Sequence, residues 1–389
     1  MKRYVQVVGR ELILWCGFLG KRRKQGGLPE MAVVKYKEVY DWILEHIQKG
    51  EWKAGTRLPS ENTLSSQFGL SRQTVRHAVD LLEQQKIVSR IQGSGTYVGP
   101  GRKEGRQKRY GTVAVISTYM DSYIFPAVLM GIEKNLAKKG YAMQMAFTGN
   151  QVGREREILI HLLTKDSIDG LIVEPAKSAL PNPNLDLYRA LGERGIPVLF
   201  FNSRYPDLDF PCVSMDDELA GMRAVQYLIG KGHRKIGGLF KSDDGQGHLR
   251  YKGFLTGMLE AGLGIRDQSI IWLDTEDLDC LYKWKDYLFD RLRESTAMVC
   301  YNDQAAWALY RLCEERGISV PGDLSLISID NSELALLPPM GLTSFSHPME
   351  ALGGKAAEHM AEMIENPCFD GNYLFEPQVV ERGSVAEIG

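Results

Sequence analysis

The sequence is poor in the residue patterns that hold metals, disulfides or phosphates. Its six cysteines include no C-x-x-C pair, and its seven histidines form no H-E-x-x-H motif. This scatter favours reduced thiols in a cytosolic protein, with neither a disulfide framework nor a metal site. No nucleophile–base pair and no phosphate-binding loop stands out, so the sequence predicts a binding protein without a cofactor rather than an enzyme.

Long hydrophobic runs are absent as well. The segment ELILWCGFLG holds an apolar run of about nine residues, which is too short to span a bilayer. Basic residues follow this run and no small-residue cleavage site appears, so a secretory signal is not indicated. We expect residues 1–30 to be a disordered N-terminal extension. A membrane anchor is the less favoured alternative.

The charge of the chain is unevenly distributed. Its 389 residues suit two or three domains. Residues 1–110 contain 21 Lys and Arg against 10 Asp and Glu, whereas the remainder contains 26 against 39. A basic front joined to an acidic back is typical of a protein that binds nucleic acid through its front part.

The front part has the pattern of short helices followed by a hairpin. Apolar residues recur with helical spacing at Val39, Ile43 and Ile47. A second helix is expected between Ser60, which suits an N-cap, and Gly69, which suits a helix end. These signals predict a compact helical domain ahead of the hairpin.

The stretch LSRQTVRHAV, residues 70–79, predicts a third helix with two arginines four residues apart. Like charges at that spacing repel by a few tenths of a kcal/mol unless an anion docks on them. Arginine can fork onto guanine or phosphate, and glutamine can pair with adenine. A helix that begins with Arg72, Gln73 and Arg76 therefore suits a DNA major groove. The glycines of the following hairpin would let backbone approach a minor groove.

Residues 35–98 resemble the winged helix-turn-helix of the GntR family of bacterial regulators. They contain the LPSE, SR-x-TVR and G-x-GT-[FY]-V elements of that family. The resemblance implies an α+β winged helix-turn-helix domain over residues 31–99 that binds double-stranded operator DNA. The DNA contacts that it implies are Arg72, Arg76, Gln73, Glu61, Gln92 and Gly93, with Lys35 and Tyr36 near phosphates.

Residues 100–110 are rich in glycine and basic residues and have no apolar stripe, so we expect a flexible linker. From Gly111 onward, near-continuous apolar strands alternate with helices. This alternation indicates parallel sheets covered by helices on both faces. A stretch of about 280 residues is too long for one such sheet, so an α/β domain with two lobes is expected.

Polar residues gather where the predicted strands end. Ligands of parallel sheets bind beyond the carboxyl ends of the strands, so these residues should line a cleft. Carboxylates, amides and cations all occur there, and Tyr123 and Phe125 would edge the cleft with aromatic rings. Such a set suits a sugar, whose hydroxyls pair with the polar groups and whose C–H face packs on an aromatic ring.

The back part is similar to the effector domains of the LacI/GalR family. The similarity lies in VSMDDELAGMRAVQYLIGKGHRKIGGLF with RYKGF, in YNDQAAWALYRLCEERGISVPGDLSLISIDNS and in LTSFSHPMEALGGKAA. It implies a periplasmic-binding-protein-like fold over residues 111–389 and a homodimer. The sugar contacts implied are first Arg250, Asp303 and Asp330, and then Asn202, Lys177, Tyr123, Glu174 and Gln246.

A GntR-type head on such a body is an uncommon combination. Together with STYMDSYIFP, DGLIVEPAKSAL, FKSDDGQG and CYND, it resembles cytoplasmic repressors that respond to L-arabinose. This resemblance implies repression of arabinose-utilisation genes, relieved by L-arabinose. The cleft composition by itself also fits another pentose, a hexose or a purine, and a sugar-modifying enzyme is the least favoured alternative.

Overall fold

The computed structural model describes residues 30–53, 55–84, 87–91, 94–99, 109–120, 123–165, 167–339 and 341–389. All but the last residue of the predicted N-terminal extension, most of the predicted linker, and Gln92 and Gly93 lie outside these residues. The chain divides into two compact units, Met1–Gly105 and Arg106–Gly389. We call them the head and the body and describe each by itself.

The described part of the head consists of helices and a two-stranded antiparallel hairpin. Its elements are α2 (Glu30–Gln48), α3 (Glu61–Phe68), α4 (Arg72–Gln84), β1 (Val88–Ile91) and β2 (Gly95–Val98). The predicted stripe of Val39, Ile43 and Ile47 is buried, and it shares the core of the head with Val75 and Val79. The helical periodicity read from the sequence is confirmed.

The helix ends of the head follow local side-chain chemistry. Ser60 Oγ accepts a hydrogen bond from Thr63 N at 3.1 Å, and Gly69 ends α3 with a left-handed φ of 62°. At the start of α4, Ser71 Oγ accepts from Thr74 N at 3.2 Å. These bonds satisfy amides that have no partner within the first turn of a helix, so they fix where α3 and α4 begin.

The described body contains two six-stranded sheets, each in its own lobe. The first sheet has the order β13-β7-β6-β5-β3-β4 and is parallel throughout. The second has the order β14-β12-β11-β10-β8-β9, in which β14 runs antiparallel to β12. The prediction of two lobes with mostly parallel sheets is confirmed.

The first lobe contains β3 (Thr112–Ser117), α5 (Phe125–Lys138), β4 (Ala142–Phe147), α6 (Val152–Lys165), β5 (Gly170–Val173), α7 (Leu185–Glu193), β6 (Val198–Phe201), β7 (Cys212–Met215), α13 (Met349–Glu365) and β13 (Tyr373–Phe375). The second contains α8 (Asp217–Gly230), β8 (Ile236–Lys241), α9 (Gly245–Glu260), β9 (Ile270–Leu273), α10 (Thr275–Asp279), α11 (Lys285–Leu292), β10 (Ala297–Cys300), α12 (Asp303–Glu315), β11 (Ser325–Asp330), β12 (Thr343–Ser346) and β14 (Gln378–Val380). Short 3₁₀ turns complete the second lobe at Asp267–Ser269, Leu281–Trp284 and Glu333–Leu336.

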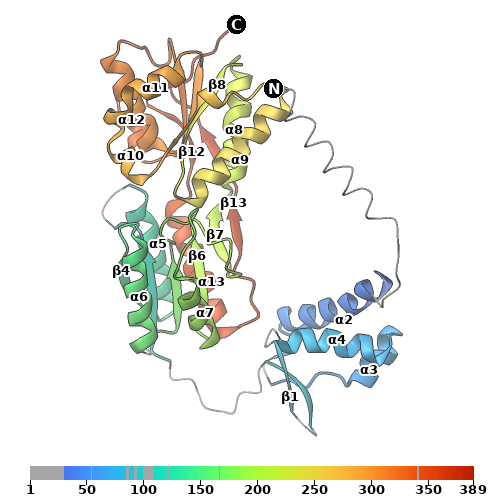
Figure 1. Ribbon diagram of the computed structural model, residues 1–389. Coiled ribbons are helices and arrows are strands. Elements are labelled where there is room, and N and C mark those ends of the chain that lie inside the picture. Colours follow the sequence, from blue (N-terminus) through green and yellow to red (C-terminus); the bar gives the residue numbers. More distant parts are fainter. Residues whose placement is uncertain are drawn as a thin grey trace, which may run out of the picture. The chain divides into compact units, whose positions relative to one another are not determined.

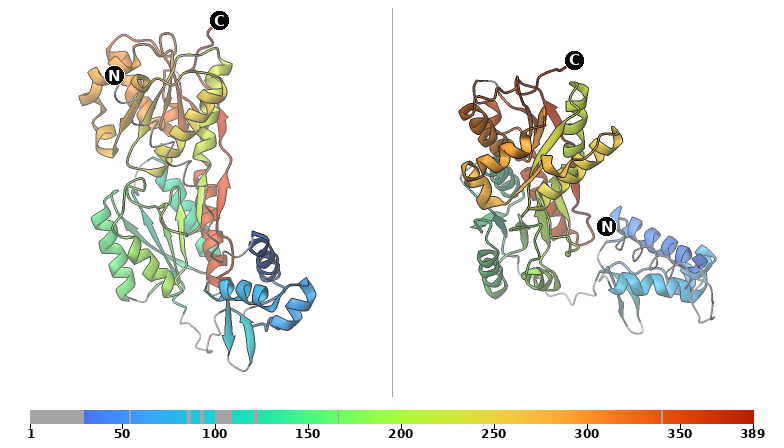
Figure 2. Two further views of the ribbon diagram at one scale, coloured as in Figure 1. Left: turned by 45° about the vertical axis from the view of Figure 1, so that its right-hand side comes forward. Right: turned by 45° about the horizontal axis from the view of Figure 1, so that its top comes forward.

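Within this unit the chain crosses between the lobes after β7, after β12 and after β13. Figure 1 shows the consequence by colour, because the red-orange α13 and β13 lie among the green elements of the first lobe. The two views in Figure 2 show the same mixture of red and green elements in the first lobe. Each lobe is therefore built from segments that are far apart in the sequence.

Glycines bring two pairs of helices into backbone contact. A Cβ atom at Gly253 of α9 would lie 1.8 Å from the carbonyl oxygen of Glu218 in α8. A Cβ atom at Gly353 of α13 would lie 2.0 Å from the carbonyl oxygen of Val128 in α5. Because α8 and α13 each follow a crossing between the lobes, these contacts tie a neighbouring helix closely to each crossing.

Candidate functional site

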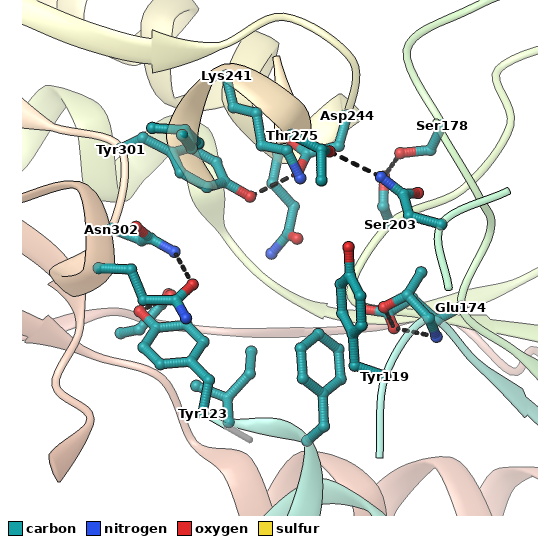
Figure 3. A pocket seen from close by; sticks show the side chains of 18 of the residues that line it. Tyr119, Tyr123, Glu174, Ser178, Ser203, Lys241, Asp244, Thr275, Tyr301 and Asn302 are labelled. Carbon is teal, nitrogen blue, oxygen red and sulfur yellow. Dashed lines mark hydrogen bonds and ion pairs between the residues drawn. The ribbon is translucent and has the colours of Figure 1, made fainter. Parts of the chain in front are cut away.

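A cavity of about 200 Å³ lies between the two lobes of the body. It opens at the carboxyl ends of the strands, where ligands of parallel sheets bind. Pockets for drug-sized ligands are larger, at about 300–1,000 Å³, so this one suits a small molecule. Figure 3 shows Tyr119 and Glu174 of the first lobe facing Lys241, Asp244 and Tyr301 of the second across the cavity.

The wall of the first lobe is built around Glu174, which follows β5 and is buried. Its Oε2 accepts hydrogen bonds from Thr118 N at 3.0 Å and Thr118 Oγ1 at 2.5 Å, and its Oε1 accepts from Asn202 Nδ2 at 2.8 Å. Burial raises the pKa of Glu174, while these hydrogen bonds oppose the rise. Asn202 thus supports Glu174 from behind, and its own Oδ1 is buried with no hydrogen-bond partner among the described residues.

The wall of the second lobe is built around Asp244, whose Oδ1 caps α9 by accepting from Gly247 N at 2.7 Å. Tyr301 donates its hydroxyl proton to Asp244 Oδ2 at 2.5 Å, and Lys241 Nζ lies 3.2 Å from the same oxygen. Burial raises the pKa of Asp244, but Lys241 and Tyr301 outweigh it and lower the pKa overall. This wall is therefore lined by the ion pair of Lys241 and Asp244, with the Tyr301 hydroxyl hydrogen-bonded to the carboxylate. Lys241 and Tyr301 were not predicted from the sequence.

Arg250 lies behind the cavity wall and organises its floor. It is 1% exposed. It donates from Nε to Asp217 Oδ1 at 2.8 Å, from Nη2 to Asp330 Oδ1 at 3.0 Å and from Nη1 to the carbonyl of Tyr301 at 2.6 Å. Burial would lower the pKa of Arg250, but the two carboxylates raise it well above its usual value. The guanidinium stays charged and holds Asp330 at the cavity.

Asp303 lies below the floor, with its carboxylate already saturated by hydrogen bonds. Oδ1 accepts from Ser328 Oγ at 2.5 Å and Ser344 Oγ at 2.6 Å, and Oδ2 accepts from Ser332 N at 2.6 Å and Ser332 Oγ at 2.8 Å. The side chain is fully buried and does not line the cavity. Its carboxylate ties together the ends of neighbouring strands, and only its backbone amide faces a lining residue, at 3.3 Å from the Tyr123 hydroxyl.

Lys177 lies at the lobe boundary rather than in the cavity lining. Its Nζ is 3.4 Å from Glu276 Oε1 and 3.7 Å from Asp243 Oδ2, and both carboxylates belong to the second lobe. The structure therefore places half of the predicted sugar contacts on the cavity wall. Those on the wall are Tyr123, Glu174, Gln246 and Asp330, and those that support it or bridge the lobes are Arg250, Asp303, Asn202 and Lys177.

In the head, the side chains predicted to read DNA lie on the first two turns of α4. Arg72, Gln73 and Arg76 are exposed, and neither arginine forms an ion pair with any residue that the structure describes. On α2, Lys35 is exposed, and Tyr36 packs edge-on against His77 with ring centroids 4.8 Å apart. This surface carries positive charge that the described head does not neutralise.

Glu61 differs from the other predicted DNA contacts because it is already paired. Its Oε1 accepts a hydrogen bond from Arg90 Nη2 at 3.1 Å. Arg90 also pairs with Glu83 at 2.9 Å and with Asp80. Arg90 of β1 therefore joins the wing to α3 and α4, and it fixes the orientation of Glu61. Arg90 was not predicted from the sequence, because nothing in its local pattern shows three carboxylates converging on it.

No group of His, Cys, Asp and Glu side chains in the described residues has the arrangement needed to hold a metal ion. No helix among them combines the length and the apolar character that crossing a bilayer requires.

Comparison with known proteins links both units to bacterial regulators. Residues 35–98 match the family model described as bacterial regulatory proteins, gntR family, and residues 225–385 match that of the periplasmic binding protein-like domain. The arabinose metabolism transcriptional repressor of Geobacillus stearothermophilus is 37% identical over 372 residues, which cover 93% of this chain and 100% of that protein. The protein of the same name from Halalkalibacterium halodurans is 35% identical over 365 residues, which cover 91% and 97%.

Solved structures agree on the fold of the body. The transcription regulator CcpA of Lactococcus lactis has a TM-score of 0.63 at 23% sequence identity, and the match covers 70% of this chain and 98% of that one. At this identity the likeness shows a shared fold. The predicted architecture, a winged helix-turn-helix domain followed by a periplasmic-binding-protein-like domain, is confirmed.

Proposed function

The chain belongs to the family of arabinose metabolism transcriptional repressors, and from this premise we propose that it binds operators of arabinose-utilisation genes and leaves them when L-arabinose fills the cavity. The observation that carries the proposal is the identity of 37% across 93% of the chain, because it spans head and body together. The prediction of a transcriptional regulator that is not an enzyme is confirmed by these relatives.

The cavity chemistry supports a small neutral sugar as the effector. Glu174 and Asp330 supply carboxylate oxygens that accept from hydroxyls, and Gln246 can both donate and accept. The rings of Tyr119 and Phe125 offer apolar surface for a C–H face. Arg250, Asp303, Asn202 and Lys177 would then act through the residues that they hold. The shape of the cavity does not by itself select one pentose, so L-arabinose is proposed from the named relatives.

The head supports binding to a DNA major groove. Arg72, Gln73 and Arg76 leave the same face of α4, where arginine and glutamine can reach base edges or phosphates. Lys35, Tyr36 and Glu61 flank this surface, and Gln92 and Gly93 are proposed contacts of the wing. One head presents one reading helix, whereas a palindromic operator has two half-sites. A homodimer in the cytoplasm is therefore part of the proposal.

Coupling between cavity and head follows from where the cavity lies. A ligand that contacts both lobes stabilises one angle between them, and the three crossings allow that angle to change. If the dimer binds the operator with a different angle, sugar and operator oppose each other. Their coupling free energy is then expected to be about 1–3 kcal/mol, as in most allosteric proteins.

A gel-shift experiment tests the proposal. Purified full-length protein should retard DNA with a palindromic site from an arabinose-utilisation promoter, and L-arabinose should release it. The controls are another pentose, a hexose and a purine at the same concentration. Release by one of these alone would assign a different effector to the same architecture, and retention of the DNA at saturating L-arabinose would refute the proposed induction.

A further inference from the structure

The hydroxyl of Tyr123 occupies a well-defined hydroxyl position on the cavity wall. It donates to Asp330 Oδ2 at 2.6 Å and accepts from the backbone amide of Asp303 at 3.3 Å. Tyr123 lies between β3 and α5 in the first lobe, whereas both partners belong to the second lobe. A group that donates to a carboxylate and accepts from an amide at one point must be a hydroxyl or a water. A sugar hydroxyl has the same capacity.

Asp330 is a fixed acceptor that requires such a partner. Its Oδ1 is held by Arg250 at 3.0 Å, and Arg250 is itself held by Asp217 and by the carbonyl of Tyr301. Asp330 is 3% exposed, so little solvent reaches Oδ2 when the lobes are in contact. An unpaired buried acceptor costs about 1–3 kcal/mol. The pair formed by Asp330 Oδ2 and the Asp303 amide therefore favours whichever hydroxyl is present.

The backbone at Tyr123 is in a conformation that is costly for this residue type. Its φ is 61°, in the left-handed region, which costs about 1–2 kcal/mol for a residue with a side chain. Burial first, and then Asp330 and Asp303, raise the pKa of Tyr123 well above its usual value, so the hydroxyl keeps the proton that it donates. The contact thus combines a short hydrogen bond to Asp330 and a longer one from the Asp303 amide with a strained backbone.

We propose that Tyr123 is an internal substitute for a hydroxyl of the effector, and that the effector displaces the Tyr123 hydroxyl from Asp330 and Asp303. This inference rests on the proposed function, since it assumes a hydroxylated ligand in the cavity. It gives Tyr123 the opposite role to that of a sugar contact. A contact raises the affinity for the effector, whereas an internal competitor lowers it.

The test is the sign of the change in affinity when the hydroxyl alone is removed. Tyr123→Phe keeps the ring and deletes the competitor. Isothermal titration of the full-length variant with L-arabinose should give a dissociation constant about two- to tenfold lower than that of the unmodified chain, as expected for one hydrogen bond. Tyr119→Phe is the matched control. Tyr119 lines the same cavity, but its hydroxyl has no hydrogen bond in the described structure, so this variant should bind no more tightly.

Two results would overturn the inference. A higher dissociation constant for Tyr123→Phe would show that Tyr123 contacts the sugar directly. An unchanged dissociation constant would show that its hydroxyl does not compete with the sugar. Thermal unfolding gives a second measure. Without sugar the variant should melt below the unmodified chain because a bond between the lobes is lost, and saturating sugar should raise its melting temperature by a larger increment.

Failure of the proposed function has a different signature. An unmodified chain that binds no L-arabinose refutes the proposed effector, whatever the variants do. The titrations are then repeated with the ligand that releases the operator in the gel-shift panel. The same comparison of Tyr123→Phe with Tyr119→Phe decides the inference for that ligand.

Discussion

Arg72 and Arg76 lie one turn apart on α4 with no carboxylate of the described head paired to either of them. Their mutual repulsion costs the free head a few tenths of a kcal/mol. Three acidic side chains of the head, those of Glu61, Asp80 and Glu83, pair instead with Arg90. The two charges therefore remain available to a polyanion, as the proposed contact with operator DNA requires.

Replacing Arg76 by alanine is expected to weaken operator binding by about 1–3 kcal/mol, because a base or phosphate contact of arginine is lost. Fluorescence anisotropy with a labelled operator measures the loss. Arg293→Ala is the control for the change in net charge, since Arg293 lies in the body and its side chain is 77% exposed. Equal affinities of the two variants would mean that α4 does not read DNA through Arg76.

His347 and Asp217 lie at two crossings between the lobes, each with a buried polar atom that lacks a partner among the described residues. Burial lowers the pKa of His347 to about 4, whereas burial raises the pKa of Asp217 to about 7. The two shifts make the free energy of unfolding change with pH in opposite directions. Above pH 4 and below pH 6.5, the unfolded chain binds more protons than the folded chain at His347, and fewer at Asp217.

Replacing His347 by phenylalanine should make the body more resistant to acid. The unfolded histidine has a pKa of 6.5 and the folded one a pKa of about 4. Native His347 therefore costs stability progressively as the pH falls from 6.5 to 4, by about 3 kcal/mol in total. Calorimetry of the body transition at pH 4.5, 5.5 and 6.5 should show the variant gaining on the unmodified chain as the pH falls. The slope from Asp217 is common to both proteins.

His161→Phe is the control for this experiment, because His161 is exposed on α6. It controls for the replacement of a histidine ring by a phenyl ring at a site that is not buried. A stability difference between His347→Phe and the unmodified chain that does not change with pH would contradict the buried, neutral state of His347.

At the scale of the helices, glycine contacts determine how closely α8 and α9 approach. Gly253→Ala should lower the stability of the body by about 1–3 kcal/mol, because a Cβ atom would overlap the carbonyl oxygen of Glu218 and force the helices apart. Gly153→Ala is the matched control, since Gly153 is a helical glycine with nothing within 4 Å of its Cβ position. It should stabilise α6 by up to about 1 kcal/mol. Thermal melts that move both variants in the same direction would contradict this packing.

Most helices and strands of the fold were predictable from sequence patterns, whereas the remaining strands depend on tertiary pairing. Helix ends at Ser60, Gly69 and Ser71 were predictable because the capping side chains act within a few residues. The strands β7, β12, β13 and β14 were missed. Of these, β13 becomes a strand only by pairing with β7, about 160 residues earlier in the chain.

Within the cavity, position along the sheet was predictable and side-chain direction was not. Glu174 and Asp330 stand on the wall because they end strands of the sheets. Asp303 follows a strand in the same way, but its carboxylate turns inward to three serines. Lys241 is the last residue of β8 and was not predicted, whereas Gln246 and Arg250, which follow it in the chain, were.

For the whole molecule, binding of sugar and of operator should be reciprocal. If saturating L-arabinose weakens operator binding by a given factor, saturating operator must weaken L-arabinose binding by the same factor, typically 5- to 150-fold. Calorimetric titration of L-arabinose into the free protein and into the protein–operator complex measures the second factor, and anisotropy measures the first. Identical sugar affinities in the two titrations would exclude coupling between body and head.

The order of segments in the body also determines the order in which a nascent chain acquires its properties. The head is complete at Val98, but the first lobe lacks α13 and β13 until Phe375 has left the ribosome. At a translation rate of about 5–20 residues per second, this interval lasts about 14–55 s. During it, the growing protein can fold a DNA-reading head while its sensor is still incomplete. If the operator is a palindrome that needs two heads, as proposed above, repression that escapes the inducer is limited at this stage, because an unpaired head reaches only one half-site.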